Sequence, residues 1–300
     1  MNMSKLTDEL VKIISDENPR QKKYLNEVFR DLLSDSEKNA LEQILVILSE
    51  EYSIEELASD YLMLISDTML ETKFFIENGR YRYSSLKEVN EKVYQNEEYM
   101  TRYMMGLLLS GYLWKNHIEI NRWYRKTIKT FQGSRFLEIG PGHGLYFLEA
   151  VSLGRFDEYT GIDLSQSSIN LANKYLNDNL PEDHKKFELI CGDINTYEIE
   201  RLFDAVCMSE VLEHVEKPEE LLKRIYDITT DKPDIYISVP INAPEIDHIF
   251  LFRSIDDVLS LVEKTGFRVC DSFYVTSNGT SYEKALKKRI AVNLALHLTK

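Results

Sequence analysis

The sequence feature that most constrains the fold is a glycine-rich turn between a short apolar segment and a helical one, FLEIGPGHG in Phe136–Gly144. Gly140 permits a tight turn, Gly142 lets the backbone approach a ligand closely, and Gly144 allows the next helix to pack near the strand. A dinucleotide-binding fingerprint needs glycine or alanine at the following position, where Leu145 stands. The turn therefore indicates a strand–turn–helix unit with a ligand at its glycines, and it disfavours an NAD-dependent enzyme.

The chain after Gly133 alternates between strand-like and helix-like segments. Strands are predicted at 136–139, 159–162, 187–191, 205–208 and 235–239, and helices at 145–151, 168–176, 218–226 and 255–265. This regular alternation predicts an α/β fold, in which a parallel sheet carries helices on both faces. We expect it to form one domain over residues 131–300.

The chain before this alternation has a helical pattern. Residues 1–130 place apolar side chains at three- and four-residue spacing, which predicts several helices. Asn78-Gly79 stands between the apolar segments 74–76 and 81–83, and an Asn-Gly pair in such a setting predicts a β-hairpin. We therefore expect a second, mainly helical domain with one hairpin.

The charge of the chain limits its partners. There are 36 basic and 50 acidic residues, a formal net charge of −14. A field of this sign repels phosphate backbones and anionic membranes, so we expect no nucleic acid and no membrane as a partner. The N-terminus lacks the apolar core and cleavage site of a secretory leader, which predicts a cytoplasmic location.

Three acidic residues fall at the predicted carboxyl ends of successive strands. Glu138 can accept an ammonium group, whereas a pyrophosphate would be repelled there. Asp163 follows Gly140 by 23 residues and can accept both hydroxyls of a ribose. Asp193 can accept a hydrogen bond from the amino group of adenine. Together they predict a cationic nucleoside as the ligand.

These segments resemble the motifs of class I S-adenosylmethionine-dependent methyltransferases. The resemblance covers about residues 130–275 and rests on LEIGPGHG, GID, GDI and the segment FDAVCMSEVLEHV of Phe203–Val215. It implies a Rossmann-like sheet of seven strands, with the final pair near 266–269 and 290–295, and S-adenosyl-L-methionine as the cofactor. The cofactor-binding residues that it implies are Glu138, Gly140, Gly142 and Gly144 at the methionine end, Asp163 and Leu164 at the ribose, Asp193 and Ile194 at the adenine, and Ser209 beside the sulfonium.

The helical first part, with its predicted hairpin, resembles the winged-helix domain of many small-molecule O-methyltransferases. The resemblance implies that residues 1–130 form a homodimer and cover a small-molecule substrate. A rival interpretation is a winged-helix regulator that senses S-adenosylmethionine, and the acidic charge of the helices opposes it.

The chemistry expected of such a site is methyl transfer to an oxygen, or otherwise a nitrogen, of a small metabolite. Transfer to carbon stays an alternative. A sulfonium methyl is already activated, so the site needs mainly to position the acceptor and exclude water. A hydroxyl or protonated amine also needs a base, and His214 and His248 follow predicted strand ends as candidate catalytic residues.

A metal offers a second route to the same chemistry. Glu210, Glu213 and His214 would share one face of a helix, and the same letters bind a divalent ion in ubiquinone-pathway and small-RNA methyltransferases that they resemble. Asp247 or His248 would complete the ligand set. Because metal-free relatives carry these letters too, we expect no metal.

Overall fold

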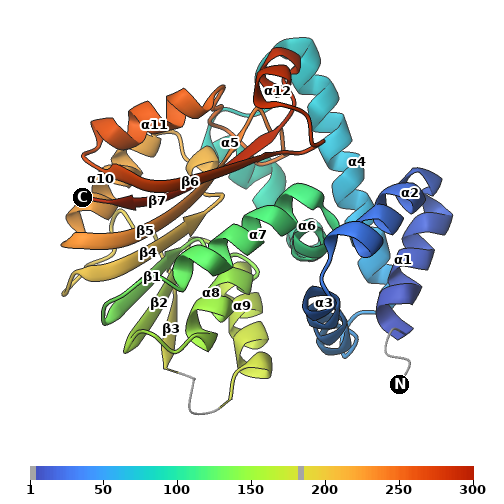
Figure 1. The fold of residues 1–300 in the computed structure, drawn as a ribbon, viewed down its shortest axis with the longest axis horizontal. Helices are drawn as coiled ribbons and strands as arrows, with labels where there is room; N and C mark the ends of the chain where they lie inside the picture. The colour runs from blue at the N-terminus through green and yellow to red at the C-terminus, as the bar shows by residue number, and fades with distance from the viewer. Residues whose placement is uncertain (1–4, 182–185) are drawn as a thin grey trace.

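A seven-stranded sheet forms the centre of the second part of the chain (Figure 1). The computed structural model describes residues 5–181 and 186–300. The strand order is β3-β2-β1-β4-β5-β7-β6, in which β1 to β5 are parallel and β7 is antiparallel to both of its neighbours. The strands are β1 (Arg135–Ile139), β2 (Glu158–Asp163), β3 (Phe187–Cys191), β4 (Phe203–Ser209), β5 (Thr229–Ile241), β6 (Arg268–Thr276) and β7 (Val292–Thr299). The predicted α/β fold is confirmed.

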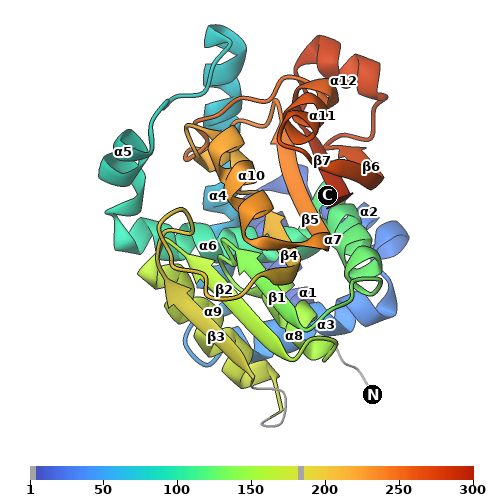
Figure 2. The same ribbon diagram turned by 90° about the vertical axis from the view of Figure 1, so that its left-hand side faces the viewer.

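Helices cover both faces of this sheet (Figures 1 and 2). They are α7 (Lys115–Ile128), α8 (Leu145–Ser152) and α9 (Gln166–Asn179) on one face, and α10 (Pro218–Asp227) and α11 (Ile255–Lys264) on the other. The strands alternate between the two layers: Phe136 packs with α7 to α9, and the next residue, Leu137, packs in the layer of α10 and α11. The helices and strands predicted here are confirmed, although β5 begins earlier than predicted, at Thr229.

The strand order places a crevice at the carboxyl end of β1. β2 lies on one side of β1, and β4, which follows β3 in the chain, lies on the other. Loops that leave β1 and β4 therefore diverge, and open α/β sheets bind ligands at such a point. The glycine-rich turn begins there, directly after Ile139.

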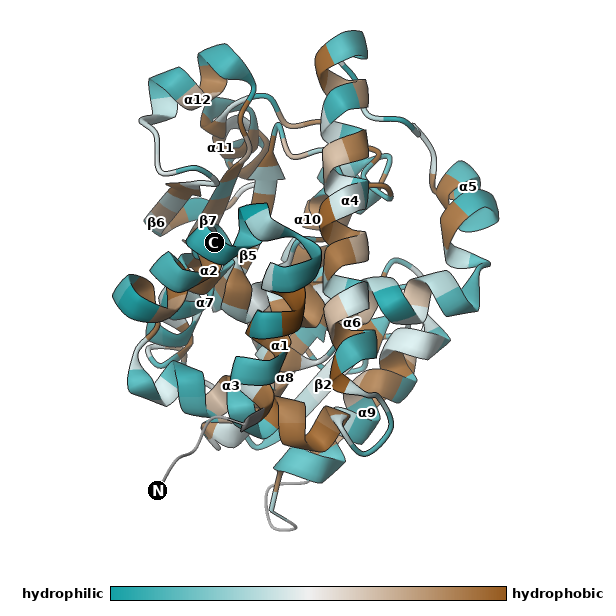
Figure 3. Ribbon diagram, turned by 90° about the vertical axis from the view of Figure 1, so that its right-hand side faces the viewer, coloured by the Kyte–Doolittle hydropathy of each residue, from teal (hydrophilic) through white to brown (hydrophobic). Residues whose placement is uncertain are grey.

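Six helices precede α7 and pack beside the sheet domain (Figure 1). They are α1 (Lys5–Glu17), α2 (Pro19–Glu27), α3 (Asp35–Leu48), α4 (Ile54–Asn78), α5 (Leu86–Val89) and α6 (Glu97–Leu113), with single π-helical turns at Val28–Leu32 and Asn90–Tyr94. Hydrophobic and hydrophilic residues alternate along α4, as expected of a helix with one packed face (Figure 3). The buried cluster of these helices includes Leu145 of α8 and Tyr175 of α9, so both parts of the chain share a core.

The hairpin predicted at Asn78-Gly79 is wrong. Residues 74–76, predicted as the first strand, are instead part of α4, a helix of 25 residues. Gly79 ends that helix in the left-handed conformation, with φ 69°. Both an Asn-Gly hairpin turn and a helix C-cap use glycine because it adopts positive φ at low cost, so the pair fits either structure. No strand precedes β1 among the described residues, and the first part is therefore helical without a wing.

The end of the chain completes the sheet as predicted. β6 and β7 are the final strand pair, and α12 (Tyr282–Lys288) connects them. Across residues 5–181 and 186–300, every helix is too short or too polar to cross a bilayer.

Candidate active site

A cavity of about 1770 Å³ lies at the carboxyl ends of the strands. The loops after β1 to β5 form one side, and α4, α6 and α7 contribute the opposing walls. Almost every predicted site residue lines it: Glu138, Gly140, Gly142, Asp163, Leu164, Asp193, Ile194, Ser209, His214 and His248. The structure thus brings the predicted cofactor-binding and catalytic residues into one space.

The glycine-rich turn shapes the cavity at the end of β1. A Cβ atom at Gly140, which has φ 68°, would lie 2.7 Å from Cγ2 of Val211. Gly144 does not line the cavity; it precedes α8 with φ 84°, and a Cβ there would lie 3.0 Å from Cα of Ala172 in α9. Gly140 therefore permits the turn, and Gly144 permits close packing of two helices.

Two carboxyl groups face the cavity beside this turn. Burial, followed by the charge of Asp163, raises the pKa of Glu138 well above its ordinary value, and Oε2 of Glu138 has no hydrogen-bond partner. Burial also raises the pKa of Asp163, although its carboxylate accepts hydrogen bonds from the backbone of Ser165 at 2.8 Å and Gly142 at 3.1 Å. A cationic or hydroxyl-bearing ligand would supply the hydrogen bonds that Glu138 lacks.

The loops after β2, β3 and β4 supply the remaining predicted contacts. Leu164 lines the cavity and is 58% exposed, so its side chain is open to contact with a ligand. Asp193 accepts hydrogen bonds from the backbone and side-chain nitrogens of Asn195, both at 2.9 Å. At the end of β4, the hydroxyl of Ser209 lies 2.7 Å from that of Ser238.

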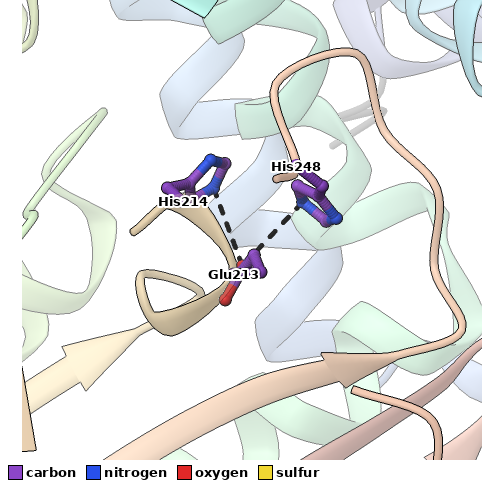
Figure 4. Close-up of side chains that lie close together, drawn as sticks. All are labelled: Glu213, His214 and His248. Atoms are coloured by element: carbon purple, nitrogen blue, oxygen red, sulfur yellow. Dashed lines mark ion pairs between the residues drawn. The ribbon is translucent and has the colours of Figure 1, made fainter. Parts of the chain in front are cut away.

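A second group of side chains, Glu213, His214 and His248, gathers beyond the end of β4 (Figure 4). Glu213 and His214 belong to a 3-10 turn, Leu212–His214, and His248 lies in the loop after β5. The turn fixes this loop, because the backbone carbonyl of Glu213 accepts the backbone N–H groups of Ile249 and Phe250, both at 2.9 Å. The three ligand-type atoms lie within 4.8 Å of one another.

Both histidines of this cluster have a defined orientation. Nδ1 of His214 lies 3.1 Å from the carbonyl oxygen of Asp247, and Nδ1 of His248 lies 2.7 Å from that of Ala243. A carbonyl can only accept, so each Nδ1 carries the hydrogen and donates it, which leaves Nε2 as the ring nitrogen directed toward Glu213. These Nε2 atoms lie 3.7 and 3.9 Å from Oε1 of Glu213.

The cluster directs three potential metal-ligand atoms toward one another. Glu213 is completely buried, neither of its carboxyl oxygens has a hydrogen-bond partner among the described residues, and burial raises its pKa well above the ordinary value. Burial lowers the pKa of His248 to about 4, which keeps this ring neutral. Two imidazoles anchored through Nδ1 and one carboxyl group are a donor set that fits a divalent metal ion.

The expectation that Glu210 shares a helix face with Glu213 and His214 is wrong. Glu210 follows β4 with a left-handed backbone, φ 53°, and the helical turn begins only at Leu212. Its carboxylate instead accepts a hydrogen bond from Nδ2 of Asn293 in β7 at 3.4 Å. The turn that carries Glu213 and His214 therefore does not include Glu210.

The helical part adds further residues to the cavity. The hydroxyl groups of Tyr94 and Tyr103 lie 3.4 and 3.2 Å from the carboxylate of Asp247. Thr68 of α4 hydrogen-bonds to both carboxyl oxygens of Glu245, at 2.9 and 3.1 Å. Both tyrosines belong to an aromatic and Met-rich stretch of the sequence, which fits either helix packing or a pocket wall, whereas no sequence signal marks Thr68.

Comparisons with known proteins agree with this geometry. Residues 137–232 match the family model described as a methyltransferase domain. The ubiquinone biosynthesis O-methyltransferase of Schizosaccharomyces pombe is 34% identical over 92 residues, which cover 31% of this chain and 32% of the relative. That of Dictyostelium discoideum is 28% identical over 160 residues, which cover 50% and 48%. The chain thus spans a third to a half of the length of these curated relatives.

A solved structure supports the fold. The mycolic acid cyclopropane synthase bound to S-adenosylhomocysteine superposes with a TM-score of 0.50 at 11% identity, over 61% of this chain and 84% of that one. The predicted cytoplasmic location is wrong on this evidence, because both curated relatives are named as mitochondrial. The family match identifies a methyltransferase domain at residues 137–232, and the strand order and the solved structure show that this domain has the class I, Rossmann-like fold.

Proposed function

We propose that the chain transfers the methyl group of S-adenosylmethionine to an oxygen of a small-molecule acceptor. The observation that carries the proposal is that one cavity is lined both by the glycine-rich turn and by His214 and His248, the two histidines that lie beside the buried Glu213. The two curated relatives, both named O-methyltransferases, favour oxygen over nitrogen or carbon as the acceptor atom. The rival interpretation as a winged-helix regulator loses support, because the first strand of the predicted hairpin is instead part of the helix α4.

In this proposal the cofactor lies across the ends of β1 to β4. Glu138 and the glycine-rich turn hold its methionine end, Asp163 and Leu164 contact the ribose, and Asp193 and Ile194 frame the adenine. Ser209 then stands beside the sulfonium. The acceptor enters the rest of the cavity, between the loop after β5 and the helices α4 and α6, which exclude water from the reacting atoms.

The cluster beyond β4 activates the acceptor hydroxyl. His214 and His248 each direct a lone pair on Nε2 toward Glu213, and such a lone pair can take a proton as a general base. The same atoms would hold a divalent metal ion, which would lower the pKa of a hydroxyl bound to it. We favour the metal over the earlier expectation of none, because three acceptors converge and no hydrogen-bond donor pairs with Glu213.

The helical part completes the enzyme as a substrate cap. Thr68, Tyr94 and Tyr103 hydrogen-bond to the loop after β5, which fixes the cap over the cavity. We propose that the chain acts as a homodimer, as the resemblance implies, and light scattering measures this directly.

Titration calorimetry with S-adenosylhomocysteine and with NAD tests cofactor use. We expect binding of the first ligand only, and Asp163→Asn to weaken it, because a charge-assisted hydrogen bond to ribose is lost. Asp157→Asn, at an exposed position in the loop before β2, is the matched control and should bind as the wild type does. Binding of NAD without S-adenosylhomocysteine would overturn the proposal.

Transfer of a labelled methyl group to a panel of small phenols and catechols tests the activation step. We expect EDTA to abolish transfer and Mg²⁺ or Mn²⁺ to restore it. Full activity in EDTA would remove the metal from the proposal and leave the two histidines as bases.

A further inference from the structure

The corner between α6 and α7 lies directly on the glycine-rich turn. A Cβ atom at Gly142 would lie 3.4 Å from Cε of Met104 in α6. A Cβ at Gly111 would lie 3.6 Å from Cδ2 of Leu145, the first residue of α8. Both helices precede residue 137, where the match to the methyltransferase family begins. The wall that they form against the turn therefore lies outside the matched segment.

His117 lies at this corner, and one of its ring nitrogens, Nε2, forms no hydrogen bond with the described residues. It lines the cavity and packs against Trp114, with ring centroids 4.8 Å apart. Asn121, one helical turn later on the same face of α7, accepts a hydrogen bond from the hydroxyl of Tyr146 in α8. His117 therefore faces the start of α8. It lies near His143 of the glycine-rich turn, which contributes, after burial, to lowering the pKa of His117.

The hydrogen bonds of Ser110 define which nitrogen of His117 carries a hydrogen. The hydroxyl of Ser110 donates to the carbonyl of Leu107 at 2.6 Å, and its oxygen lies 2.8 Å from Nδ1 of His117. A hydroxyl has one hydrogen, so Nδ1 must donate to Ser110, and Nε2 of the neutral ring keeps a lone pair. Burial keeps the ring neutral, since it lowers the pKa of His117 to about 4.

The hydrogen bond of the His117 ring to the described residues is made by Nδ1, so Nε2 is left for a ligand in the cavity that the ring lines. Methionine-type ligands carry one hydrogen-bond donor at this end, the α-ammonium group. We propose that His117 is a specificity-determining residue for the cofactor, and that its Nε2 accepts a hydrogen bond from the α-ammonium group at the amino-acid end of S-adenosylmethionine. The inference rests on the proposed use of that cofactor, and it assigns part of its recognition to the helical first part.

The test compares two ligands that differ in the amino-acid end. S-adenosylhomocysteine carries it, and 5′-methylthioadenosine has the same nucleoside and sulfur without it. We expect His117→Leu to weaken binding of S-adenosylhomocysteine about 10-fold or more, as expected when a charge-assisted hydrogen bond is lost, and to leave 5′-methylthioadenosine within about 2-fold. His117→Gln keeps an acceptor oxygen and should restore most of the affinity for S-adenosylhomocysteine.

Two control variants distinguish a failure of the inference about His117 from a failure of the proposed function. Lys126→Gln changes an exposed residue of α7 and should bind both ligands as the wild type does. Asp163→Asn should weaken both ligands, because both contain the ribose. Equal losses of both ligands in His117→Leu, or no loss of either, would overturn the inference while leaving the proposed function intact. Failure of the wild type to bind either ligand would instead overturn the proposed function.

Discussion

Replacement of Glu213 by glutamine should make the metal-free protein more stable while it removes metal binding. Glu213 is completely buried, and its two carboxyl oxygens have no hydrogen-bond partner among the described residues. Nε2 of His214 and Nε2 of His248 lie 3.7 and 3.9 Å from its Oε1. A buried polar group whose partner is a ligand lowers the stability of the folded protein when that ligand is absent.

The size of the gain follows from the hydrogens available in the cluster. With its raised pKa, Glu213 takes up a proton in the metal-free protein and can donate it to one imidazole only. A glutamine amide brings two N–H groups and can donate to both. One additional neutral hydrogen bond contributes about 1 kcal/mol, so Glu213→Gln should raise the free energy of unfolding by about that amount in EDTA.

Urea unfolding of the full chain measures the effect. In EDTA the variant should have the higher midpoint, whereas Mg²⁺ or Mn²⁺ at about 100 times its dissociation constant should stabilise the wild type by about 2.7 kcal/mol and the variant not at all. Glu220→Gln, an exposed residue paired with Lys217, is the control and should change stability by less than about 1 kcal/mol. A Glu213→Gln protein that is less stable in EDTA would show that Glu213 has a structural partner, and would refute the reasoning.

Two further predictions concern the contact between the two parts of the chain. Hydrogen bonds from Arg122 lower the pKa of Glu37 from 4.5 to about 2, so the pair stabilises the fold above pH 4.5 and loses this effect as the pH falls toward 2. Glu37→Gln should therefore lower the free energy of unfolding by about 1–2 kcal/mol at pH 7, after allowance for solvent screening, and urea titrations at pH 7 and 3 should show this difference shrink. A difference that stays constant with pH would contradict the ion pair as its cause. A fragment of residues 131–300 should aggregate or unfold in circular dichroism, because Leu145 and Tyr175 lose the helices that cover them, and a soluble, cooperatively folded fragment would refute the shared core.

The sheet and its ligand edge could be predicted from the sequence because their signals are local. The turn at Phe136–Gly144 requires positive φ at particular glycines, Asp163 is the last residue of β2, and Asp193 lies two residues after the end of β3. Parallel strands bring such carboxyl ends to one edge whatever the details of packing. A motif of this kind therefore specifies both a fold and a position within it.

The first part of the chain could not be predicted equally well, since its signals fit more than one structure. Asn78-Gly79 suits a hairpin and a helix end, and only the packing of α4 along its full length decides between them. Glu210 fails for a related reason, because its left-handed backbone, with φ 53°, separates it from the turn that carries Glu213 and His214, and a glutamate gives no sequence signal for positive φ. The contacts of Tyr103 and Thr68 with the loop after β5 join residues more than 140 positions apart, and no local pattern indicates them.

The packing of α7 determines where this chain could be joined to part of another protein in order to change its acceptor. α7 precedes β1 in the chain, yet Trp123 and Tyr124 are buried in the layer that covers β5 and β7. A chimaera that takes its acceptor specificity from another protein should therefore be joined near Trp114, at the corner before α7, rather than at the start of the sheet. The segment to replace is then α1 to α6. α7 stays with the sheet, on which it packs, and is kept unchanged in every such chimaera.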